Sequence, residues 1–226
     1  MRKFAISDIH GCNTTFQALL DKIALSTSDE LYLLGDYVDR GPDSKEVIDH
    51  ILHLQKKGYT VHCLWGNHEQ MMQKALAEDA TETDMYHWLL NGGLATMNSF
   101  TAAYPEGDIP DQYQLFLNQL HDYLEVDNYI LVHAGLNFRH ADPLTDRESM
   151  LWIRQWYDNI RYDWLQGRSI VHGHTPVGKP HIEAQDFGSA INIDAGCVYK
   201  GAERGYLCAL DMTNQKFYWQ PNVENA

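Results

Sequence analysis

The sequence lacks several features that would assign it to a common class of protein. Its 226 residues include four cysteines, and no two of them form a C-x-x-C pair. No stretch approaches the roughly 18 uninterrupted apolar residues that cross a membrane. These absences argue against a zinc–thiolate site or a dithiol redox motif, and they exclude a membrane-spanning helix. With no signal-peptide pattern at the N-terminus, we expect a cytoplasmic protein with reduced thiols.

Basic residues are also few. The chain has 17 Lys and Arg against 31 Asp and Glu, which gives a formal net charge of −14. A nucleic-acid-binding protein should carry a basic stripe, and none is visible. We therefore expect no nucleic-acid partner. An acidic chain can still bind anionic phosphoesters where metal ions supply the positive charge.

The hydrophobic pattern predicts an α/β fold. Short apolar runs that end in polar residues are typical of buried strands. Between the early runs lie two helical patterns, one capped by Asn13 and one that opens at Pro42 and stops at Gly58. The predicted strands are Lys3–Asp8, Leu31–Asp36, Tyr59–Asn67, Tyr129–Gly135, Ser169–Thr175 and Ala190–Gly196.

The remaining segments predict a helical insertion and a final pair of strands. Residues 69–125 are mostly helical in pattern, with a loop at 104–107, and should lie over the sheet. After Ser169 the pattern predicts strands only, ending with an antiparallel pair at Tyr206–Met212 and Lys216–Gln220. Because no linker or repeat interrupts the chain, we expect one domain over residues 1–226.

Polar clusters stand where the predicted strands end, which is the edge of an open α/β sheet that binds ligands. Asp8 and His10 are two residues apart and point to the same side, so they can form half of a divalent-metal site. Asp36 can bridge two metals. Each cluster alone is a weak signal, but unpartnered buried groups at five strand ends would be costly. The other candidate ligands are Asn67, His133 and His174.

The clusters and their neighbours resemble the phosphoprotein phosphatase (PPP) family of metallophosphoesterases. Within it the chain is similar to the small bacterial and bacteriophage serine/threonine phosphatases of the lambda-phosphatase type, over nearly its whole length. Ser7 stands where that family usually has Gly, and we expect no functional loss from this small residue. The matching motifs are Asp8–Gly11, Gly35–Gly41, Gly66–Met72, His87–Gly93, His133–Gly135, Leu151–Arg154, Gly173–Pro176 and Ile193–Gly196.

The resemblance implies a calcineurin-like metallophosphoesterase fold, with two central mixed β-sheets flanked by helices in an αββα sandwich. It also implies a binuclear metal centre. Oxygen and imidazole ligands without thiolate suit Mn, Fe, Zn or Mg, and do not by themselves select one of them. We expect two Mn ions, with Fe/Zn as the alternative. The implied ligands are Asp8, His10 and Asp36 for metal one, and Asp36, Asn67, His133 and His174 for metal two.

The resemblance further implies direct attack on phosphorus by a hydroxide that bridges the two metals, without a covalent phospho-enzyme. His68 is the implied general acid for the leaving alkoxide, oriented and kept protonated by Asp39. Arg40 and Arg154 resemble phosphate-binding arginines. The structural alternatives are a turn histidine at His68 and a surface ion pair at Arg40.

For the other reactive or aromatic side chains near these motifs, a structural role is the preferred interpretation. Cys12 as a nucleophile is a poor alternative to packing at the start of a helix. His172 faces the same side as His174 and is expected to support the site rather than bind metal. The aromatic residues from Trp152 to Trp164 could line a groove, but core packing is the preferred interpretation.

We therefore expect a metal-dependent phosphoprotein phosphatase that acts on phosphoserine and phosphothreonine, and also on phosphotyrosine, in protein or peptide partners. The main alternative is a symmetrical diadenosine tetraphosphate hydrolase on the same scaffold. Those relatives characteristically lack the Asp of the Asp-Arg pair and carry Asp after Asn-His, whereas this chain has Asp39 and Glu69. An inactive phosphoprotein-binding module is a further alternative, disfavoured because no expected ligand is missing.

Overall fold

The computed structural model describes residues 1–107 and 110–224, and these form two mixed β-sheets. The first sheet has the order β3-β2-β1-β8-β9, in which β1, β2 and β3 are parallel and β8 and β9 are antiparallel. Its strands are β1 (Lys3–Ile6), β2 (Glu30–Leu33), β3 (Thr60–Cys63), β8 (Tyr206–Asp211) and β9 (Lys216–Pro221).

The second sheet has the order β4-β5-β6-β7, with β4 antiparallel to β5 and the other pairs parallel. Its strands are β4 (Tyr123–Val126), β5 (Tyr129–Val132), β6 (Ser169–His172) and β7 (Ala190–Asn192). The parallel strands of both sheets fall within the predicted runs except β2, which begins one residue earlier, at Glu30.

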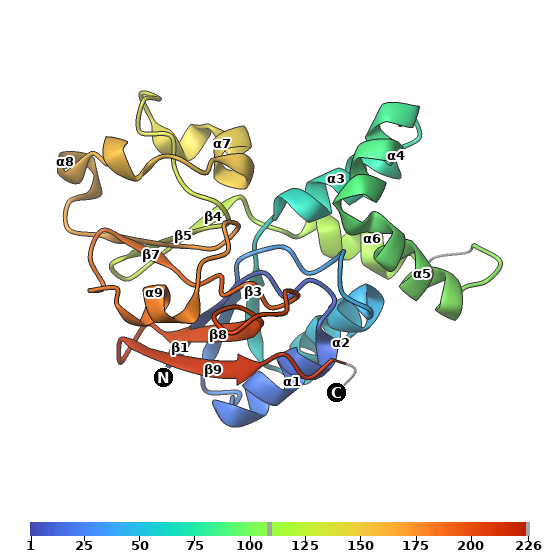
Figure 1. Ribbon diagram of the computed structural model, residues 1–226, viewed down its shortest axis with the longest axis horizontal. Helices are drawn as coiled ribbons and strands as arrows, with labels where there is room; N and C mark the ends of the chain where they lie inside the picture. The colour runs from blue at the N-terminus through green and yellow to red at the C-terminus, as the bar shows by residue number, and fades with distance from the viewer. Residues whose placement is uncertain (108–109, 225–226) are drawn as a thin grey trace.

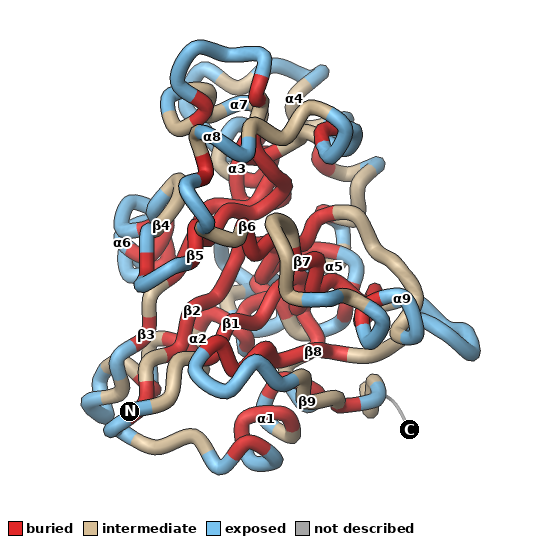
Figure 2. Tube along the Cα trace, turned by 90° about the vertical axis from the view of Figure 1, so that its left-hand side faces the viewer, coloured by how far each residue is buried: buried red, intermediate tan, exposed pale blue. Residues whose placement is uncertain are grey.

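The two sheets pack face to face because alternate residues of their strands are apolar on both sides. On β1, Phe4 and Ile6 point to the helices on the outer face, while Ala5 joins the layer between the sheets. On β5, Leu131 enters the same middle layer and Ile130 faces outward. Figure 2 shows the resulting buried centre, which the strands of both sheets cross. The predicted αββα sandwich is therefore observed.

Helices α1 (Asn13–Lys22) and α2 (Ser44–Lys56) cover the outer face of the first sheet (Figure 1). The prediction that Asn13 caps α1 is wrong, because Asn13 is the first helical residue and Cys12 precedes it without a side-chain cap. The backbone N–H of Thr15 instead donates to Oε1 of Glu224, at 2.7 Å. The capping group thus comes from the distant end of the chain.

The predicted insertion is largely helical but ends earlier than expected. The wrong part is its C-terminal end, because β4 begins at Tyr123 and pairs with β5 across Leu124 and Leu131. Residues 108 and 109 of the predicted insertion lie outside the described residues. The helical elements are α3 (Asn67–Ala75), α4 (Glu82–Trp88), a π-helical turn (Leu89–Gly93), α5 (Leu94–Ala103) and α6 (Asp111–Asn118).

Short helices cover the outer face of the second sheet. Helices α7 (Arg147–Trp152) and α8 (Tyr162–Leu165) bury Met150 and Leu165 against it, together with Trp156. Trp156 is thus a core residue, as the preferred interpretation of the aromatic stretch predicts. The prediction of strands only after Ser169 is wrong, since α9 (Lys179–Glu183) buries Ile182 between the sheets.

Across the described residues, the helices are too short or too polar for a membrane span.

Candidate metal centre

The predicted metal ligands all follow parallel strands of the two sheets, and most of their ligand atoms lie within a few ångströms of one another. Each ligand side chain is at most 5% exposed. In chain order they are Asp8 and His10 after β1, Asp36 after β2, Asn67 at the start of α3, His133 after β5 and His174 after β6.

Asp36 occupies the middle of the cluster. Its Oδ2 lies 3.4 Å from Nε2 of His10, and its Oδ1 lies 3.4 Å from Nε2 of His133. Each carboxylate oxygen therefore faces one imidazole, as a bridging ligand requires. Within 4.8 Å the ligand atoms form two groups that share Asp36, one with His10 and His68 and one with His133 and His174.

Asn67 belongs to the second of these groups. Its Oδ1 lies 3.0 Å from Nε2 of His133 and 2.8 Å from Nδ1 of His174. This is the ligand set predicted for metal two. The set predicted for metal one is met less fully, because Asp8 is in neither three-residue group. Both oxygens of Asp8 accept the backbone N–H of His174, at 3.2 and 3.0 Å, and Oδ2 also accepts the hydroxyl of Ser7.

The imidazoles present unprotonated nitrogens to the cluster. Nδ1 of His10 donates to the carbonyl of Val38 at 2.9 Å, and Nδ1 of His133 donates to that of Leu34 at 2.7 Å. Nε2 of each ring then carries the lone pair, which in His10 accepts a hydrogen bond from Nη1 of Arg40 at 2.7 Å. Nε2 of His174 is buried and has no hydrogen-bond partner among the described residues.

The protonation states that burial favours for the imidazoles fit a divalent cation. Burial lowers the pKa of His10, His133 and His174, so these rings are neutral, as metal-ligating imidazoles must be. Burial, and then the charges of Asp8 and Glu69, raise the pKa of Asp36 well above its ordinary value, so the metal-free site favours the neutral acid and a bound cation would release this proton. Neutral imidazoles around a carboxylate give a donor set suited to two divalent metal ions.

The backbone at the cluster is strained. Non-glycine residues rarely adopt positive φ, and each instance costs roughly 1–3 kcal/mol. Such strain collects at functional sites, because the surrounding fold must hold it in place. The predicted site residues with positive φ are Asp8 (52°), His10 (49°), Asp36 (56°), Asp39 (71°), Arg40 (69°) and His174 (66°).

Glu69 fixes the loop that carries Asp36. Its Oε2 accepts the backbone N–H of Asp36 at 2.8 Å and that of Gly66 at 3.0 Å. Its Oε1 accepts the N–H groups of Tyr37 and Val38 at 2.7 and 3.2 Å. A buried carboxylate with four backbone donors is a positioning group, and the sequence analysis did not assign this role to it.

The predicted pair of His68 and Asp39 is formed, with Nδ1 of His68 2.7 Å from Oδ2 of Asp39. Asp39 also accepts Nε1 of Trp88 at 3.0 Å and the hydroxyl of Thr96 at 2.6 Å. These two donors lie in the helical insertion and were missed. The only signal for them was the His87–Gly93 motif, which includes Trp88.

The pKa values at this pair agree with only half of the prediction. Burial lowers the pKa of His68 well below its ordinary value and raises the pKa of Asp39 to about 7. Asp39 therefore orients the ring as expected. Burial opposes the predicted standing positive charge on His68, because it disfavours both charged partners.

Replacing Thr96 with valine is expected to lower kcat about tenfold for a phosphate ester with a poor leaving group, because a charge-assisted hydrogen bond to Asp39 is lost. The rate on an aryl phosphate should change much less, since that leaving group needs no proton. Thr96→Ser keeps the hydroxyl and should restore the rate. Steady-state kinetics on both substrates would refute this positioning role if Thr96→Val slowed them equally.

The two predicted arginines lie at different groups of the cluster. Nη1 of Arg40 is 2.7 Å from Nε2 of His10, and Nη1 of Arg154 donates to the carbonyl of His174 at 3.4 Å and the hydroxyl of Thr175 at 3.2 Å. Arg40 is exposed and Arg154 is also solvent-facing. Both guanidinium groups can therefore meet phosphate oxygens that approach from solvent.

His172 and Cys12 are placed as structural residues. Nε2 of His172 contacts the hydroxyl of Tyr157 at 2.9 Å, and its Nδ1 lies 3.1 Å from the carbonyl of Gly173. Neither contact involves a predicted metal ligand. Cys12 is buried, and its thiol donates to the carbonyl of His10 at 3.6 Å, in agreement with the packing interpretation.

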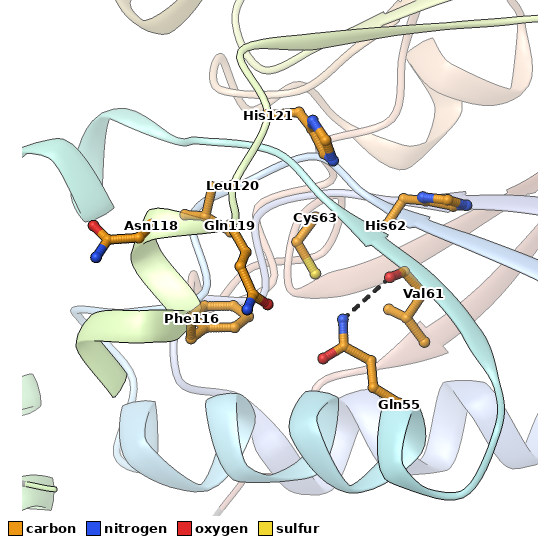
Figure 3. Close-up of a pocket in the computed structure, with 9 residues that line it drawn as sticks. All are labelled: Gln55, Val61, His62, Cys63, Phe116, Asn118, Gln119, Leu120 and His121. Atoms are coloured by element: carbon orange, nitrogen blue, oxygen red, sulfur yellow. Dashed lines mark hydrogen bonds between the residues drawn. The ribbon is translucent and has the colours of Figure 1, made fainter. Parts of the chain in front are cut away.

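A separate cavity of about 480 Å³ lies at edge strand β3, between the end of α2 and the segment after α6. Figure 3 shows His62, Cys63 and His121 at its wall, and Nε2 of Gln55 donating to the carbonyl of Val61, at 3.2 Å. None of the predicted site residues lines it. The candidate metal centre is therefore independent of this cavity.

The sequence model of a family described as "Calcineurin-like phosphoesterase" matches residues 1–204. The chain belongs to this family. The narrower prediction of a lambda-phosphatase-type serine/threonine phosphatase remains a prediction.

Relatives in this family include proteins named "Bis(5'-nucleosyl)-tetraphosphatase PrpE [asymmetrical]". The one from Bacillus subtilis is 29% identical over 231 residues, which cover 89% of this chain and 88% of the relative. The one from Halalkalibacterium halodurans is 26% identical over 224 residues, which cover 87% and 86%. These relatives match the chain over nearly its whole length.

Solved structures share the fold. A protein described as a candidate diadenosine tetraphosphatase superposes with a TM-score of 0.67 at 22% identity, covering 100% of this chain and 95% of that one. A protein serine/threonine phosphatase from Saccharomyces cerevisiae superposes with a TM-score of 0.63 at 15% identity, covering 100% and 81%. The predicted calcineurin-like metallophosphoesterase fold is confirmed.

Proposed function

We propose that this protein is a metal-dependent hydrolase of bis(5'-nucleosyl) tetraphosphates that cuts its substrate into unequal products, a nucleoside monophosphate and a nucleoside triphosphate. The observation that carries the reaction type is the position of Asp36, with one oxygen toward His10 and the other toward His133. The substrate class is supported by relatives of that name, which match most of the chain.

The relatives favour a dinucleotide hydrolase over the phosphoprotein phosphatase that the sequence motifs predict. Asp39 and Glu69 distinguish this chain from symmetrical hydrolases, whereas the similar relatives are named asymmetrical. Glu69 accepts four backbone N–H groups and is 0% exposed, so it cannot select a substrate by contact. The presence of Glu rather than Asp at position 69 therefore says little about which substrate the protein binds.

The residues of the candidate site would have three roles in the reaction: holding the metal ions, binding phosphate and donating a proton. Divalent ions, when bound, supply an activated water and neutralise phosphate charge. Asp36, Asn67 and the neutral imidazoles would hold them. Arg40 and Arg154 would bind the phosphate oxygens, and His68 would donate a proton where the departing group is an alkoxide, since a departing phosphate is already stable.

A phosphoprotein phosphatase acting on phosphoserine, phosphothreonine and phosphotyrosine is the second candidate. The observation that favours it is the 2.7 Å contact between His68 and Asp39. An oriented proton donor matters most for an alkoxide, whereas a phosphate leaving group is already stable. In that case the partners would be phosphorylated proteins or peptides.

Two further points are proposals on the same basis. We propose Mn as the activating metal, with Fe/Zn as the alternative, and the oxygen and imidazole donors are compatible with each of these metals. We also propose a cytoplasmic location, since all four cysteines are free and buried.

The test removes bound metal with a chelator, restores Mn, and compares diadenosine tetraphosphate with a phosphoserine peptide at equal concentrations. We expect faster cleavage of the dinucleotide, with adenosine monophosphate and triphosphate in equal amounts. The Asp36→Asn variant, purified in parallel, should be inactive on both and so controls for contaminating enzymes. Fast release of phosphate from the peptide with an inert dinucleotide would establish the second candidate instead.

A further inference from the structure

A second cavity opens beside the metal centre at the loop between β7 and β8. Its volume is about 460 Å³, within the range of small-molecule sites. Arg40 lines it and also reaches Nε2 of His10, at 2.7 Å, so the cavity and the metal centre share this residue. The lining residues that carry charge or an aromatic ring are Arg40, Tyr199, Lys200, Arg204 and Glu224.

The cavity is positively charged, although the chain as a whole has a formal charge of −14. Arg40, Lys200 and Arg204 stand against one lining carboxylate, Glu224. Oε1 of Glu224 already accepts the N–H of Thr15, at 2.7 Å. None of the three cations forms an ion pair with another described residue. Arg40 and Arg204 also lower the pKa of the buried Asp194 by their charge, whereas no such contact is found for Lys200 among the described residues. The excess of cations at the cavity wall favours an anionic ligand.

The loop is held closed at its base by backbone hydrogen bonds, which fix the backbone that carries Tyr199, Lys200 and Arg204. The backbone N–H groups of Tyr199 and Gly205 both donate to the carbonyl of Gly196, at 2.9 and 3.0 Å. The N–H of Asn222 donates to the carbonyl of Gly205, at 2.8 Å. Gly196 has a φ of +63°, and a Cβ there would lie 2.8 Å from the ring of Tyr199, so glycine permits the ring to pack closely.

Tyr199 and Arg204 form an exposed pair. The guanidinium carbon of Arg204 lies 5.9 Å from the centroid of the Tyr199 ring, and Tyr199 is 40% exposed. An exposed aromatic ring can stack on a nucleobase, and Arg binds phosphate through paired N–H groups. A ring and cations in one cavity suit a ligand with both a base and phosphates.

We propose that this cavity, which we call the polyphosphate cavity, binds the portion of a nucleoside polyphosphate that extends beyond the metal centre. Arg40, Lys200 and Arg204 bind its phosphates, and Tyr199 stacks on its base. The inference rests on the proposed function, because a tetraphosphate chain has several phosphates and the metal centre acts on one of them. It also explains how an acidic protein holds a substrate with a large negative charge.

The test measures equilibrium binding to the chelator-treated protein, so that it depends on neither metal nor turnover. Adenosine triphosphate and inorganic tripolyphosphate are titrated by calorimetry into the wild type, Tyr199→Leu, and the Lys200→Gln/Arg204→Gln double variant. Lys57→Gln is the matched control, because Lys57 is exposed at the far end of α2 and lines no part of the cavity.

We expect the double variant to weaken binding of both ligands by roughly tenfold or more, as the loss of charged hydrogen bonds implies. Tyr199→Leu should weaken the binding of adenosine triphosphate by about tenfold and leave the affinity for tripolyphosphate unchanged, because only the nucleotide has a base to stack. Lys57→Gln should bind both ligands as the wild type does. Equal affinities for all four proteins, or no binding by the wild type, would overturn the proposal.

Turnover then separates this inference from the proposed function. With Mn restored, KM for diadenosine tetraphosphate should be about tenfold higher in the double variant than in the wild type. KM for p-nitrophenyl phosphate should change by no more than about twofold, because the small ester does not reach the cavity. A wild type that binds adenosine triphosphate but does not cleave the dinucleotide would refute the proposed function alone. A wild type that cleaves the dinucleotide with an unchanged KM in the double variant would refute the cavity alone.

Discussion

The Asp36→Asn variant is expected to lose hydrolysis of every phosphoester substrate, by roughly 10³-fold or more, because one carboxylate serves both halves of the metal centre. Its two oxygens lie 3.4 Å from Nε2 of His10 and 3.4 Å from Nε2 of His133, so neither half can be completed without it. The measurement is kcat/KM on p-nitrophenyl phosphate with saturating Mn, together with the metal content of the purified variant.

The stability of the metal-free Asp36→Asn variant should not fall. Burial raises the pKa of Asp36, so the ionised group destabilises the metal-free fold above that pKa, and a neutral amide removes this cost. Asp122→Asn is the matched control, since Asp122 pairs with Arg147 at the surface and should leave activity unchanged. An Asp36→Asn protein that keeps its metal and its rate would contradict the bridging role.

The second large effect is expected at His68. His68→Asn should slow hydrolysis of phosphoserine by roughly 10²–10³-fold, because an alkoxide must be protonated as it leaves. The same change should slow an aryl phosphate far less, and diadenosine tetraphosphate should resemble the aryl phosphate because its leaving group is a stable phosphate. Steady-state rates on the three substrates give the comparison.

His172→Asn is the matched control for His68→Asn. His172 is also a buried imidazole, but its contacts are with Tyr157 and Gly173. Any effect of this variant on folding should lower all three rates by one factor. If His68→Asn also lowers all three rates by the same factor, His68 is not the general acid, and its contact with Asp39 only stabilises the structure.

The polar residues that meet at the candidate metal centre were predictable because each belongs to a short motif at the end of a strand. Alternating apolar residues locate strands such as β1 and β2 from the sequence alone, and the polar residues after them must then meet at one edge of the sheet. The pairing of the two sheets was different, since it was inferred from a family resemblance. Strand patterns do not specify which faces meet.

The missed features depend on contacts between distant parts of the chain. The N-terminus of α1 is capped by Glu224, which no local pattern at Asn13 could reveal. Strand β4 has four residues and is defined by its pairing with β5, while α9 is a short helix whose Ile182 is buried between the sheets. Tertiary packing decides such short elements more than local propensity does.

The environment of Asp39 was missed for the same reason. Trp88 and Thr96 reach it from the helical insertion, 49 and 57 residues along the chain. The insertion was predicted as a cover over the sheet, whereas in the structure it supplies hydrogen-bond donors to the predicted acid pair. Ser7 was expected to have no effect on function. Its hydroxyl donates a hydrogen bond to Asp8 and so adds a contact at the candidate metal centre.

The central claim is that Asp36 joins two metal ions in one site, and metal counting tests it most directly. The protein is stripped with a chelator, reconstituted with Mn, freed of excess metal, and measured by elemental mass spectrometry against protein concentration. We expect two Mn ions per wild-type chain and a loss of both in Asp36→Asn. One ion or none in the wild type, or two ions retained in the variant, would contradict the binuclear centre.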